Sequence, residues 1–287
     1  MDKQGRVVLI TGCSTGIGRA TAERLARAGF KVYATARRPD SIADLRQKGC
    51  EVLALDVTSD ESMRAAVAAI EAKEGAVDAL VNNAGYSQSG AVETVSMEAA
   101  RAQVETNVFG LARLTQLVLP GMRKKGAGRI VNVSSMGGKL TFPGGGWYHA
   151  TKHAVEALSD ALRMELRPFG VDVIVVEPGP IASEFGNTVG SAMSGPAVSD
   201  PAGPYAEFNR RVQLATTKSY QPGGLALGPL GGTSDDVAKA IERALARRRA
   251  PTRVRVTAMA KILLFLRWML PDRAFDAIVS SAMKSAA

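Results

Sequence analysis

A glycine-rich turn near the start of the chain constrains the fold more than any other feature. Residues 7–10 are all apolar, as in a short buried strand, and residues 19–28 repeat apolar positions at helical spacing. Between them lies Thr-Gly-Cys-Ser-Thr-Gly-Ile-Gly, residues 11–18. Its glycine spacing differs from G-x-G-x-x-G, but the strand and helix around it are those that this dinucleotide fingerprint requires. The segment therefore predicts a turn whose amides face a pyrophosphate at the start of a helix.

Apolar segments and helical segments alternate along the rest of the chain. This order predicts a parallel sheet with helices on both faces. Strands are expected near residues 7–11, 31–35, 51–55, 79–82, 129–133, 171–177 and 253–257. The principal helices are expected at 97–125, 147–169 and 234–248. No linker interrupts the 287 residues, and α/β folds of this length commonly form one domain.

A tyrosine and a lysine one helical turn apart form a second informative feature. Tyr148 and Lys152 fall on one face of the helix expected at 147–169. A fixed ammonium favours the phenolate of a tyrosine, whose pKa is ordinarily ~10, so the phenol could exchange a proton near neutral pH. Ser135 supplies a hydroxyl thirteen residues before Tyr148. For the pair alone, the alternative of two ordinary surface residues is common.

Together these motifs resemble the short-chain dehydrogenase/reductase family, whose signatures are T-G-x-x-x-G-x-G and Y-x-x-x-K. Further family motifs follow in order: Asn82-Asn83-Ala84-Gly85, Glu105-Thr106-Asn107-Val108, Val131-Asn132-Val133-Ser134-Ser135 and Pro178-Gly179. The resemblance covers residues 7 to about 257. It implies an α/β fold, a Rossmann-type doubly wound parallel sheet of about seven strands with helices on both faces, in a single domain spanning residues 1–287. Residues 10–16 and 32–37 are similar to the branch of retinol and 17-beta-hydroxysteroid dehydrogenases.

The resemblance also implies roles for individual residues. Tyr148 would exchange the substrate proton, Lys152 would lower the tyrosine pKa and hold the nicotinamide ribose, and Ser135 would hydrogen-bond the substrate oxygen. Ser134 is a rival, but the family's thirteen-residue separation from Tyr148 selects Ser135. Asn107 would anchor a water through its backbone; a helix kink is a compatible reading. The implied cofactor contacts are Gly12, Ser14, Thr15, Gly16, Ile17, Gly18, Arg37, Asp56, Val57, Asn83, Ala84, Gly85, Tyr148, Lys152, Pro178, Gly179, Ile181 and Ser183.

The end of the second expected strand favours NADP(H) over NAD(H). An acidic residue there would bind the ribose 2′-hydroxyl and repel a 2′-phosphate, but this chain has Ala36. Arg37 and Arg38 follow and can neutralise a phosphate, although two solvated arginines are the alternative. The Thr15 hydroxyl could also reach that phosphate by family resemblance. Asp56 matches a family contact to adenine; its plainer reading is a helix N-cap.

These features predict an oxidoreductase that interconverts a lipophilic alcohol and its ketone or aldehyde by hydride transfer. One alternative is a 3-oxoacyl-thioester reductase, which a substrate panel would separate. Another is a non-catalytic nucleotide-binding sensor, which would not need the intact Ser135, Tyr148 and Lys152. The family resemblance implies a homodimer or homotetramer.

Two segments are expected to close the substrate cleft. Residues 183–232 are rich in Gly, Pro and Ser and follow the sixth strand, so we interpret them as a substrate loop. Residues 258–287 are expected to form a helical extension, whose segment 259–270 covers the cleft or a subunit contact. Twelve residues are too few to span a bilayer, and lying on a membrane surface is the less favoured reading. The expected apolar lining is Leu225, Leu227, Leu230, Ile262, Leu263, Phe265, Leu266 and Trp268.

Composition narrows the remaining possibilities. The net charge of +9 could favour binding to nucleic acid. The sequence has no basic cluster with aromatic residues among its cations, however, so a solvated basic surface is the favoured interpretation. Two cysteines indicate neither a disulfide framework nor a metal cluster, and no metal is expected. His149 and His153 lack metal-ligand partners. The first strand begins within a few residues of Met1, which leaves no room for a targeting peptide and predicts a cytoplasmic protein.

Overall fold

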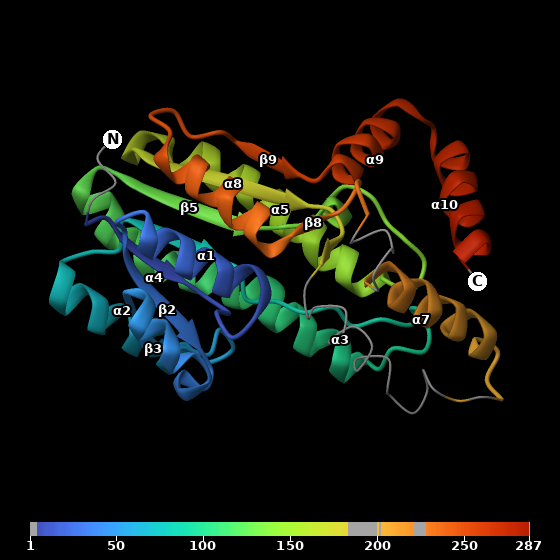
Figure 1. The fold of residues 1–287 in the computed structure, drawn as a ribbon, viewed down its shortest axis with the longest axis horizontal. Helices are drawn as coiled ribbons and strands as arrows, with labels where there is room; N and C mark the ends of the chain where they lie inside the picture. Colours follow the sequence, from blue (N-terminus) through green and yellow to red (C-terminus); the bar gives the residue numbers. More distant parts are fainter. Residues whose placement is uncertain (1–4, 183–199, 201, 221–227, 287) are drawn as a thin grey trace.

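Seven parallel strands form the centre of the molecule (Figure 1). The computed structural model describes the chain except residues 1–4, 183–199, 201, 221–227 and 287. The strand order is β3-β2-β1-β4-β5-β6-β9, and each neighbouring pair is parallel. The strands are β1 (Val7–Ile10), β2 (Lys31–Ala36), β3 (Cys50–Ala54), β4 (Ala79–Asn82), β5 (Gly128–Val133), β6 (Val171–Pro178) and β9 (Arg253–Val256). The expected doubly wound fold is confirmed, with strand ends shifted by at most one residue.

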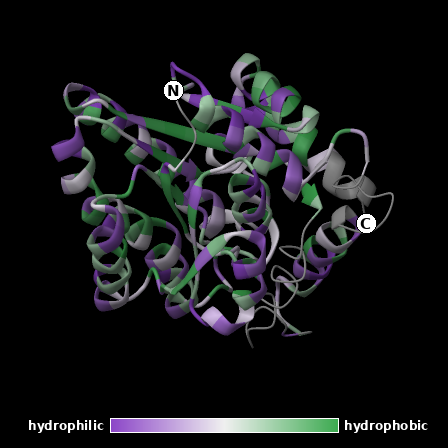
Figure 2. Ribbon diagram, turned by 60° about the vertical axis from the view of Figure 1, so that its left-hand side comes forward, coloured by the Kyte–Doolittle hydropathy of each residue, from purple (hydrophilic) through white to green (hydrophobic). Residues whose placement is uncertain are grey.

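Helices cover both faces of this sheet and bury two separate cores. One face carries α1 (Gly16–Arg27), α8 (Ser234–Ala246) and the 3-10 segment η1 (Pro39–Lys48). The other face carries α2 (Asp60–Glu74), α4 (Leu111–Lys125) and α5 (Gly146–Leu166). The central strands are hydrophobic along most of their length, while the helices alternate hydrophobic and hydrophilic positions (Figure 2). A strand buried on both faces needs a continuous apolar run, which explains why β1 reads Val-Val-Leu-Ile.

The reversal of strand order around β1 determines where a ligand can bind. β1 lies between β2 and β4, so the connections from these strands run in opposite directions across the sheet. A crevice opens at the carboxyl ends of strands at such a switch point. The turns after β1, β4, β5 and β6 meet at this edge, and they carry the motifs identified in the sequence.

The helix expected over residues 97–125 is interrupted. The structure has α3 (Met97–Val104), then the π-helical turn η2 (Glu105–Gly110), then α4. Gly110 packs closely against the turn that precedes α2. A Cβ on Gly110 would lie 2.4 Å from the Val57 carbonyl oxygen. Asn107 lies within this π-helical turn. The helix expected at 147–169 likewise ends as α5 at Leu166, followed by the 3-10 turn η4 (Arg167–Phe169).

The segments expected to close the cleft contain further helices. The described part of residues 183–232 includes α7 (Ala206–Tyr220) and the first residue of β8 (Gly232–Thr233), which pairs with β7 (Ile181–Ala182). Beyond β9 lie α9 (Ala258–Met269) and α10 (Asp272–Ala286), and α10 returns towards α7 (Figure 1). Among the described helices, none has both the length and the apolar composition needed to cross a bilayer.

A single residue makes the turn from β9 into α9. Thr257 has φ 87° and ψ 149°, a region that residues other than glycine rarely occupy. Its hydroxyl oxygen accepts a hydrogen bond from the Ala260 amide at 3.2 Å and so caps α9. Gly179 lies directly beside it, because a Cβ on Gly179 would sit 2.2 Å from the Thr257 hydroxyl oxygen. The turn after β6 and the start of α9 are therefore packed against each other.

Candidate active site

The glycine turn after β1 is shaped by contacts that exclude larger residues. Gly12 and Gly16 have φ values of 72° and 58°, which favour glycine. A Cβ on Gly18 would lie 2.2 Å from the Gly12 carbonyl oxygen, so the first turn of α1 packs directly on the loop. A Cβ on Gly12 would lie 2.9 Å from the Ala84 Cα. Gly12 and Gly18 are thus required by close backbone approaches, and Gly16 is favoured by its left-handed backbone conformation.

The turn after β4 is tied to this loop by side-chain hydrogen bonds. The Asn83 amide nitrogen Nδ2 donates to the carbonyl oxygens of Thr11 at 2.9 Å and Gly12 at 3.1 Å. In return, the Thr11 hydroxyl oxygen accepts from the backbone amides of Asn83 and Ala84, both at 3.0 Å. Asn83 therefore supports the loop that a cofactor would contact, and Thr11 is a supporting residue that the sequence analysis missed.

The start of α1 fits the phosphates of a dinucleotide. Thr15 is the N-cap, but its hydroxyl makes no capping hydrogen bond, so the first-turn amides keep their donors for an anion. Gly12 and Gly18 leave a cradle that any Cβ would fill. Beyond β2, Arg37 is exposed and forms no ion pair with any residue that the structure describes. These features fit a dinucleotide with a phosphate near Arg37.

The turn after β3 differs from one reading of its sequence. The N-cap of α2 is Ser59, whose side chain accepts from the Ser62 amide, so Asp56 is not the cap. Asp56 instead accepts from the amide and hydroxyl of Thr58, at 2.9 and 2.8 Å. This turn fixes the Asp56 carboxylate at the carboxyl edge of the sheet, where the adenine contact was expected.

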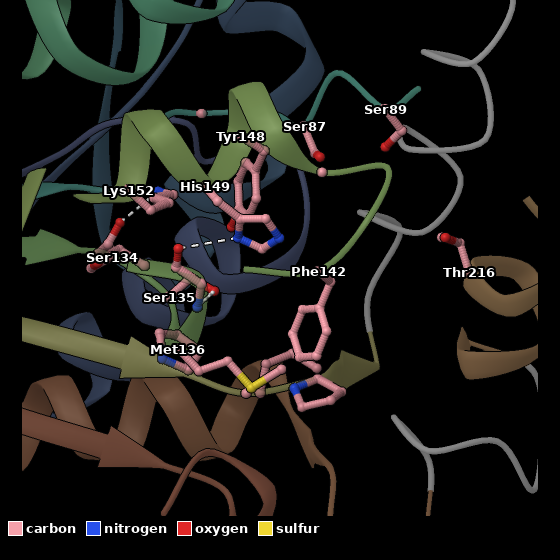
Figure 3. A pocket seen from close by; sticks show the side chains of 18 of the residues that line it. Ser87, Ser89, Ser134, Ser135, Met136, Phe142, Tyr148, His149, Lys152 and Thr216 are labelled. Atoms are coloured by element: carbon pink, nitrogen blue, oxygen red, sulfur yellow. Dashed lines mark hydrogen bonds between the residues drawn. The ribbon is translucent and has the colours of Figure 1, made fainter. Parts of the chain in front are cut away.

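Helix α5 carries the tyrosine and lysine side by side (Figure 3). The Lys152 nitrogen Nζ lies 5.8 Å from the centre of the Tyr148 ring and donates a 2.8 Å hydrogen bond to the Val133 carbonyl oxygen. Burial lowers the pKa of Lys152 to about 8, while nearby Glu156 opposes that shift. The lysine therefore bridges α5 to the end of β5.

The two serines after β5 have different surroundings. The Ser134 hydroxyl oxygen is buried and has no hydrogen-bond partner within the described part of the chain. Ser135 is half-buried and lines the cavity next to Tyr148 (Figure 3). Its hydroxyl oxygen accepts from the Gly137 amide at 3.0 Å, which orients the oxygen and leaves its hydrogen to donate. Both serines line the cavity, and the choice of Ser135 over Ser134 stays a prediction.

The π-helical turn places the Asn107 side chain in contacts with the protein. Its Nδ2 donates to the Tyr86 carbonyl at 2.9 Å and the Thr151 hydroxyl at 3.1 Å, and its Oδ1 accepts from the Tyr86 amide at 3.1 Å. Thr151 in turn donates to the Tyr148 carbonyl at 2.7 Å. Asn107 thus joins η2 to the turn of α5 that carries Tyr148, and the expected water contact of its backbone stays a prediction.

Neighbouring His149 is held in one tautomer. Its Nδ1 lies 3.1 Å from the Gly137 carbonyl oxygen, which can only accept, so Nδ1 carries the hydrogen. Burial lowers its pKa to about 4, and the ring is therefore neutral near pH 7. Its edge packs on Phe142 and Tyr148, with ring centres 5.8 and 5.6 Å away. His149 lines the cavity, although the sequence analysis assigned it no chemistry.

Comparison with known proteins decides the family. The model described as short chain dehydrogenase matches residues 6–194. The chain belongs to the short-chain dehydrogenase/reductase family. It is 37% identical to the uncharacterized oxidoreductase YbbO of Escherichia coli over 95% of this chain and 93% of that protein. It is also 42% identical to the 3-ketodihydrosphingosine reductase of Bacteroides thetaiotaomicron, over 63% and 66%, and 32% identical to the NADPH-dependent 3-dehydrocapnine reductase of Ornithobacterium rhinotracheale, over 97% and 98%.

Solved structures of short-chain dehydrogenases share the whole fold. One from Streptomyces avermitilis is 35% identical, covers 100% of this chain and 98% of its own, and superposes with a TM-score of 0.78. Another from Burkholderia phymatum, solved with NAD, is 28% identical over 94% and 95%, with a TM-score of 0.76. A third from Burkholderia cenocepacia, solved with NADP, is 25% identical over 97% and 99%, with a TM-score of 0.74. The chain is thus an NAD(P)-dependent dehydrogenase or reductase, and its narrower branch stays a prediction.

A cavity of about 660 Å³ brings most of the expected site residues of this short-chain dehydrogenase together. Its lining includes Gly12, Thr15, Gly16, Ile17, Asn83, Ala84, Gly85, Ser135, Tyr148, Lys152, Pro178, Gly179 and Ile181. Ser14, Gly18, Arg37, Asp56, Val57 and Asn107 are not among the lining residues. Ser183 lies outside the described residues. The cavity therefore joins the glycine turn to the Tyr148 pair in one space.

The apolar part of the cavity differs from the expected lining. Leu263 lines it, together with Met259, Val212, Ile278 and Val279 of α9, α7 and α10. The expectation that Phe265 lines the cleft is wrong. Ile262, Phe265 and Trp268 are exposed, as is Leu230, and Leu266 packs outside the cavity against the Leu140 and Phe275 cluster. Leu225 and Leu227 lie outside the described residues. A helix can turn only part of its surface to the cleft, and here Ala260 and Leu264 take the buried face.

Neither cysteine is positioned for chemistry in this dehydrogenase. Burial raises the pKa of Cys13 to about 12 and that of Cys50 to about 11. Thiolates are the reactive form, so both thiols are inert near neutral pH. Among the described residues no group of three or more His, Cys, Asp or Glu side chains could hold a metal ion.

The buried ammonium predicts a pH-dependent stability. Folding lowers the Lys152 pKa from 10.5 to about 8, so between these values the unfolded chain binds more protons than the folded chain. The free energy of unfolding should then rise with pH in the wild type relative to Lys152→Met, by at most roughly 3 kcal/mol over that window. Urea unfolding of both proteins from pH 7 to 10.5 measures this difference. The exposed Lys48→Met is the control, and a flat difference curve for Lys152→Met would contradict the prediction.

Proposed function

We propose that this protein interconverts a lipophilic alcohol and its ketone or aldehyde with NADP(H) as the cofactor. The observation that carries the proposal is the single cavity in which Ser135, Tyr148 and Lys152 face side chains from the C-terminal helices. Apolar walls with a few placed polar groups are typical of sites for small lipophilic molecules. Two relatives bear the names 3-ketodihydrosphingosine reductase and NADPH-dependent 3-dehydrocapnine reductase. Both names support a reductase, and the second supports NADPH as its cofactor.

The preference for NADP(H) rests on the end of β2. Ala36 ends the strand and offers no carboxylate to a ribose 2′-hydroxyl, and exposed Arg37 follows it. A guanidinium there can bind a 2′-phosphate, while no acidic neighbour within the described residues neutralises it as an ion pair. When bound, the reduced cofactor supplies the hydride.

The chain's own residues would handle the proton. Tyr148 gives its phenolic proton to the substrate oxygen in reduction and takes it back in oxidation. The Lys152 ammonium, held 5.8 Å from the ring centre, favours the ionised phenol. Ser135, oriented by the Gly137 amide, donates a hydrogen bond to the same substrate oxygen and stabilises its developing charge. Asn107 holds the turn of α5 that carries Tyr148 through Thr151.

Removal of the phenolic proton tests the assignment of Tyr148. Tyr148→Phe should lower kcat by about 10²–10⁴-fold while the affinity for NADPH changes by a few-fold or less, because only the proton donor is lost. Steady-state kinetics and calorimetric titration with NADPH measure the two quantities. Ser134→Ala, at the neighbouring buried hydroxyl, is the comparison for Ser135→Ala and should retain more activity. A Tyr148→Phe variant that keeps more than about a tenth of wild-type kcat would refute the role.

The cofactor preference can be reversed at β2. Ala36→Asp combined with Arg37→Ala should favour NADH over NADPH, since a carboxylate binds the ribose hydroxyls and repels the 2′-phosphate. The ratio of kcat/KM for the two cofactors measures the change. Arg46→Ala, on the far side of η1, should leave that ratio unaltered. A wild type that already prefers NADH would remove the argument from Arg37.

The substrate class is tested by a ladder of alkyl ketones. If the C-terminal helices bind the alkyl chain, each added methylene should raise kcat/KM by up to about fourfold, equivalent to ~0.8 kcal/mol, until the cavity is full. Leu263→Ala should flatten the series, whereas Phe265→Ala, at an exposed position, should not. A wild-type series that is flat or falls with length counts against the lipophilic site. Acyl thioesters in the same panel test the alternative 3-oxoacyl-thioester reductase.

We also propose a homodimer or homotetramer. Phe109 of η2 and Met164 of α5 are exposed apolar residues on the helices that carry Asn107 and Tyr148. Large exposed apolar side chains on neighbouring helices favour contact with another subunit. Light scattering on the wild type and on Phe109→Ser with Met164→Ser measures the mass.

A further inference from the structure

The outer surface of α9 carries apolar side chains that no described residue covers. Ile262, Phe265, Trp268 and Met269 are 48%, 52%, 81% and 55% exposed, and we call them the α9 ridge. Ile262, Phe265 and Met269 follow the i, i+3, i+7 spacing of one helix face, and Trp268 lies beside them. Single exposed apolar residues are ordinary, but four within two turns of one helix mark an interaction surface.

A strongly basic groove lies along one side of this ridge. It has a volume of about 900 Å³ between α8 and β9 and is lined by Lys239, Arg243, Arg247 and Lys261, which we call the basic groove. These four cations are exposed and form no ion pair with any residue in the described ranges. Arg253 and Arg255 also line the groove but are paired with Glu156, Asp160 and Glu177. Asp236 is the acidic residue of the lining, and it is engaged in the capping box of α8.

The substrate cavity lies along the other side of the ridge. Met259 and Leu263 of α9 line the cavity, whereas Lys261 of the same helix lines the basic groove. With 3.6 residues per turn, Ile262, Met269 and Phe265 of the ridge occupy the arc between these two sides, and Trp268 lies just beyond Lys261. One helix therefore presents, around its axis, the cavity wall, most of the apolar ridge and a cation of the groove that is flanked by Phe265 and Trp268.

We propose that this surface binds an anionic lipid bilayer, with the α9 ridge among the head groups and the basic groove against lipid phosphates. Trp and Phe on an amphipathic helix beside Lys and Arg are typical of segments that lie in a membrane interface. In this orientation α9 lies between the cavity and the membrane, and a lipophilic substrate would be concentrated in that membrane. The binding itself does not depend on the proposed reaction.

Charge argues against a second copy of the chain as the occupant. A two-fold contact through this surface would bring the basic groove close to its own copy, and apposed like charges disfavour association. An anionic bilayer satisfies both parts of the surface at once.

Sedimentation with sucrose-loaded vesicles tests the proposal on the full chain without cofactor or substrate. At about 50 mM salt the protein should partition at least tenfold more strongly to phosphatidylcholine vesicles containing 30% phosphatidylglycerol than to pure phosphatidylcholine. Anionic lipid attracts the cations of the basic groove, and salt at this concentration screens that attraction only weakly. Phe265→Ser with Trp268→Ser should weaken this partitioning at least tenfold. Lys239→Glu with Lys261→Glu should do the same and reduce its salt dependence.

Matched variants separate this surface from the general positive charge. Lys48→Glu with Lys73→Glu gives the same change in net charge at the β3 edge, opposite β9, and should change partitioning by less than twofold. Val92→Ser with Met97→Ser removes two exposed apolar residues elsewhere and should be equally mild. Brominated lipid should quench the wild type and leave Trp268→Phe largely unquenched.

Three results would overturn the proposal. The first is equal partitioning to neutral and anionic vesicles, and the second is an equal loss in the two control variants. The third combines two observations: the wild type does not bind vesicles, and the Phe265→Ser, Trp268→Ser double variant has a lower mass than the wild type by light scattering. A second copy of the chain would then cover the ridge. A failure of the ketone series leaves these measurements unaffected, so the two proposals fail separately.

Discussion

The contact between the turns after β1 and β4 is the constraint on which the site depends. Gly12 touches Ala84, Gly18 touches Gly12, and the Asn83 side chain binds the carbonyl oxygens that end β1. These contacts can form only if β1 and β4 are neighbours in the sheet with their carboxyl ends level, as their register shows. The parallel pairing of β4 with β5 and of β5 with β6 continues this alignment of carboxyl ends. Ser135, Lys152 and Gly179 thereby line the same cavity at this edge. A local glycine pattern thereby fixes the position of residues more than one hundred and sixty places away along the chain.

The sequence was sufficient to predict the sheet and the residues around its carboxyl edge. Buried parallel strands are short apolar runs, and glycines in tight turns leave a strong local pattern, so β1 and α1 could be recognised directly, whereas the Tyr148 and Lys152 pair became informative only beside the other family motifs. The π-helical turn was anticipated only as a compatible kink at Asn107, because the packing of Gly110 on Val57 and the hydrogen bonds of Asn107 to Tyr86 are contacts between distant segments, which a local pattern does not reveal. For the same reason, Lys152 donating to Val133 and the tautomer of His149 became visible only in the structure.

The C-terminal helices show the limit of reading amphipathic segments from composition. The run of apolar residues in α9 did not indicate which face of the helix is buried, since both faces are rich in leucine, phenylalanine and isoleucine. In the structure Ala260 and Leu264 are buried, Leu263 lines the cavity and Phe265 points away from it. The buried face of α9 is determined by Thr257 at the start of the helix and by the packing of α10 through Phe275 and Val279. The spacing of apolar residues in the sequence indicates neither of these contacts. The glycine-rich segment similarly concealed α7.

The strained turn at Thr257 joins the start of α9 to the turn after β6. A threonine with φ 87° costs on the order of 1–3 kcal/mol relative to relaxed backbone, and glycine would avoid that cost. Glycine would also remove the hydroxyl that caps α9 and rests against Gly179. One threonine side chain therefore both begins the outer helix and rests against a glycine that lines the cavity. The position of the cavity wall after β6 and the direction in which α9 leaves the sheet are thus fixed at the same residue.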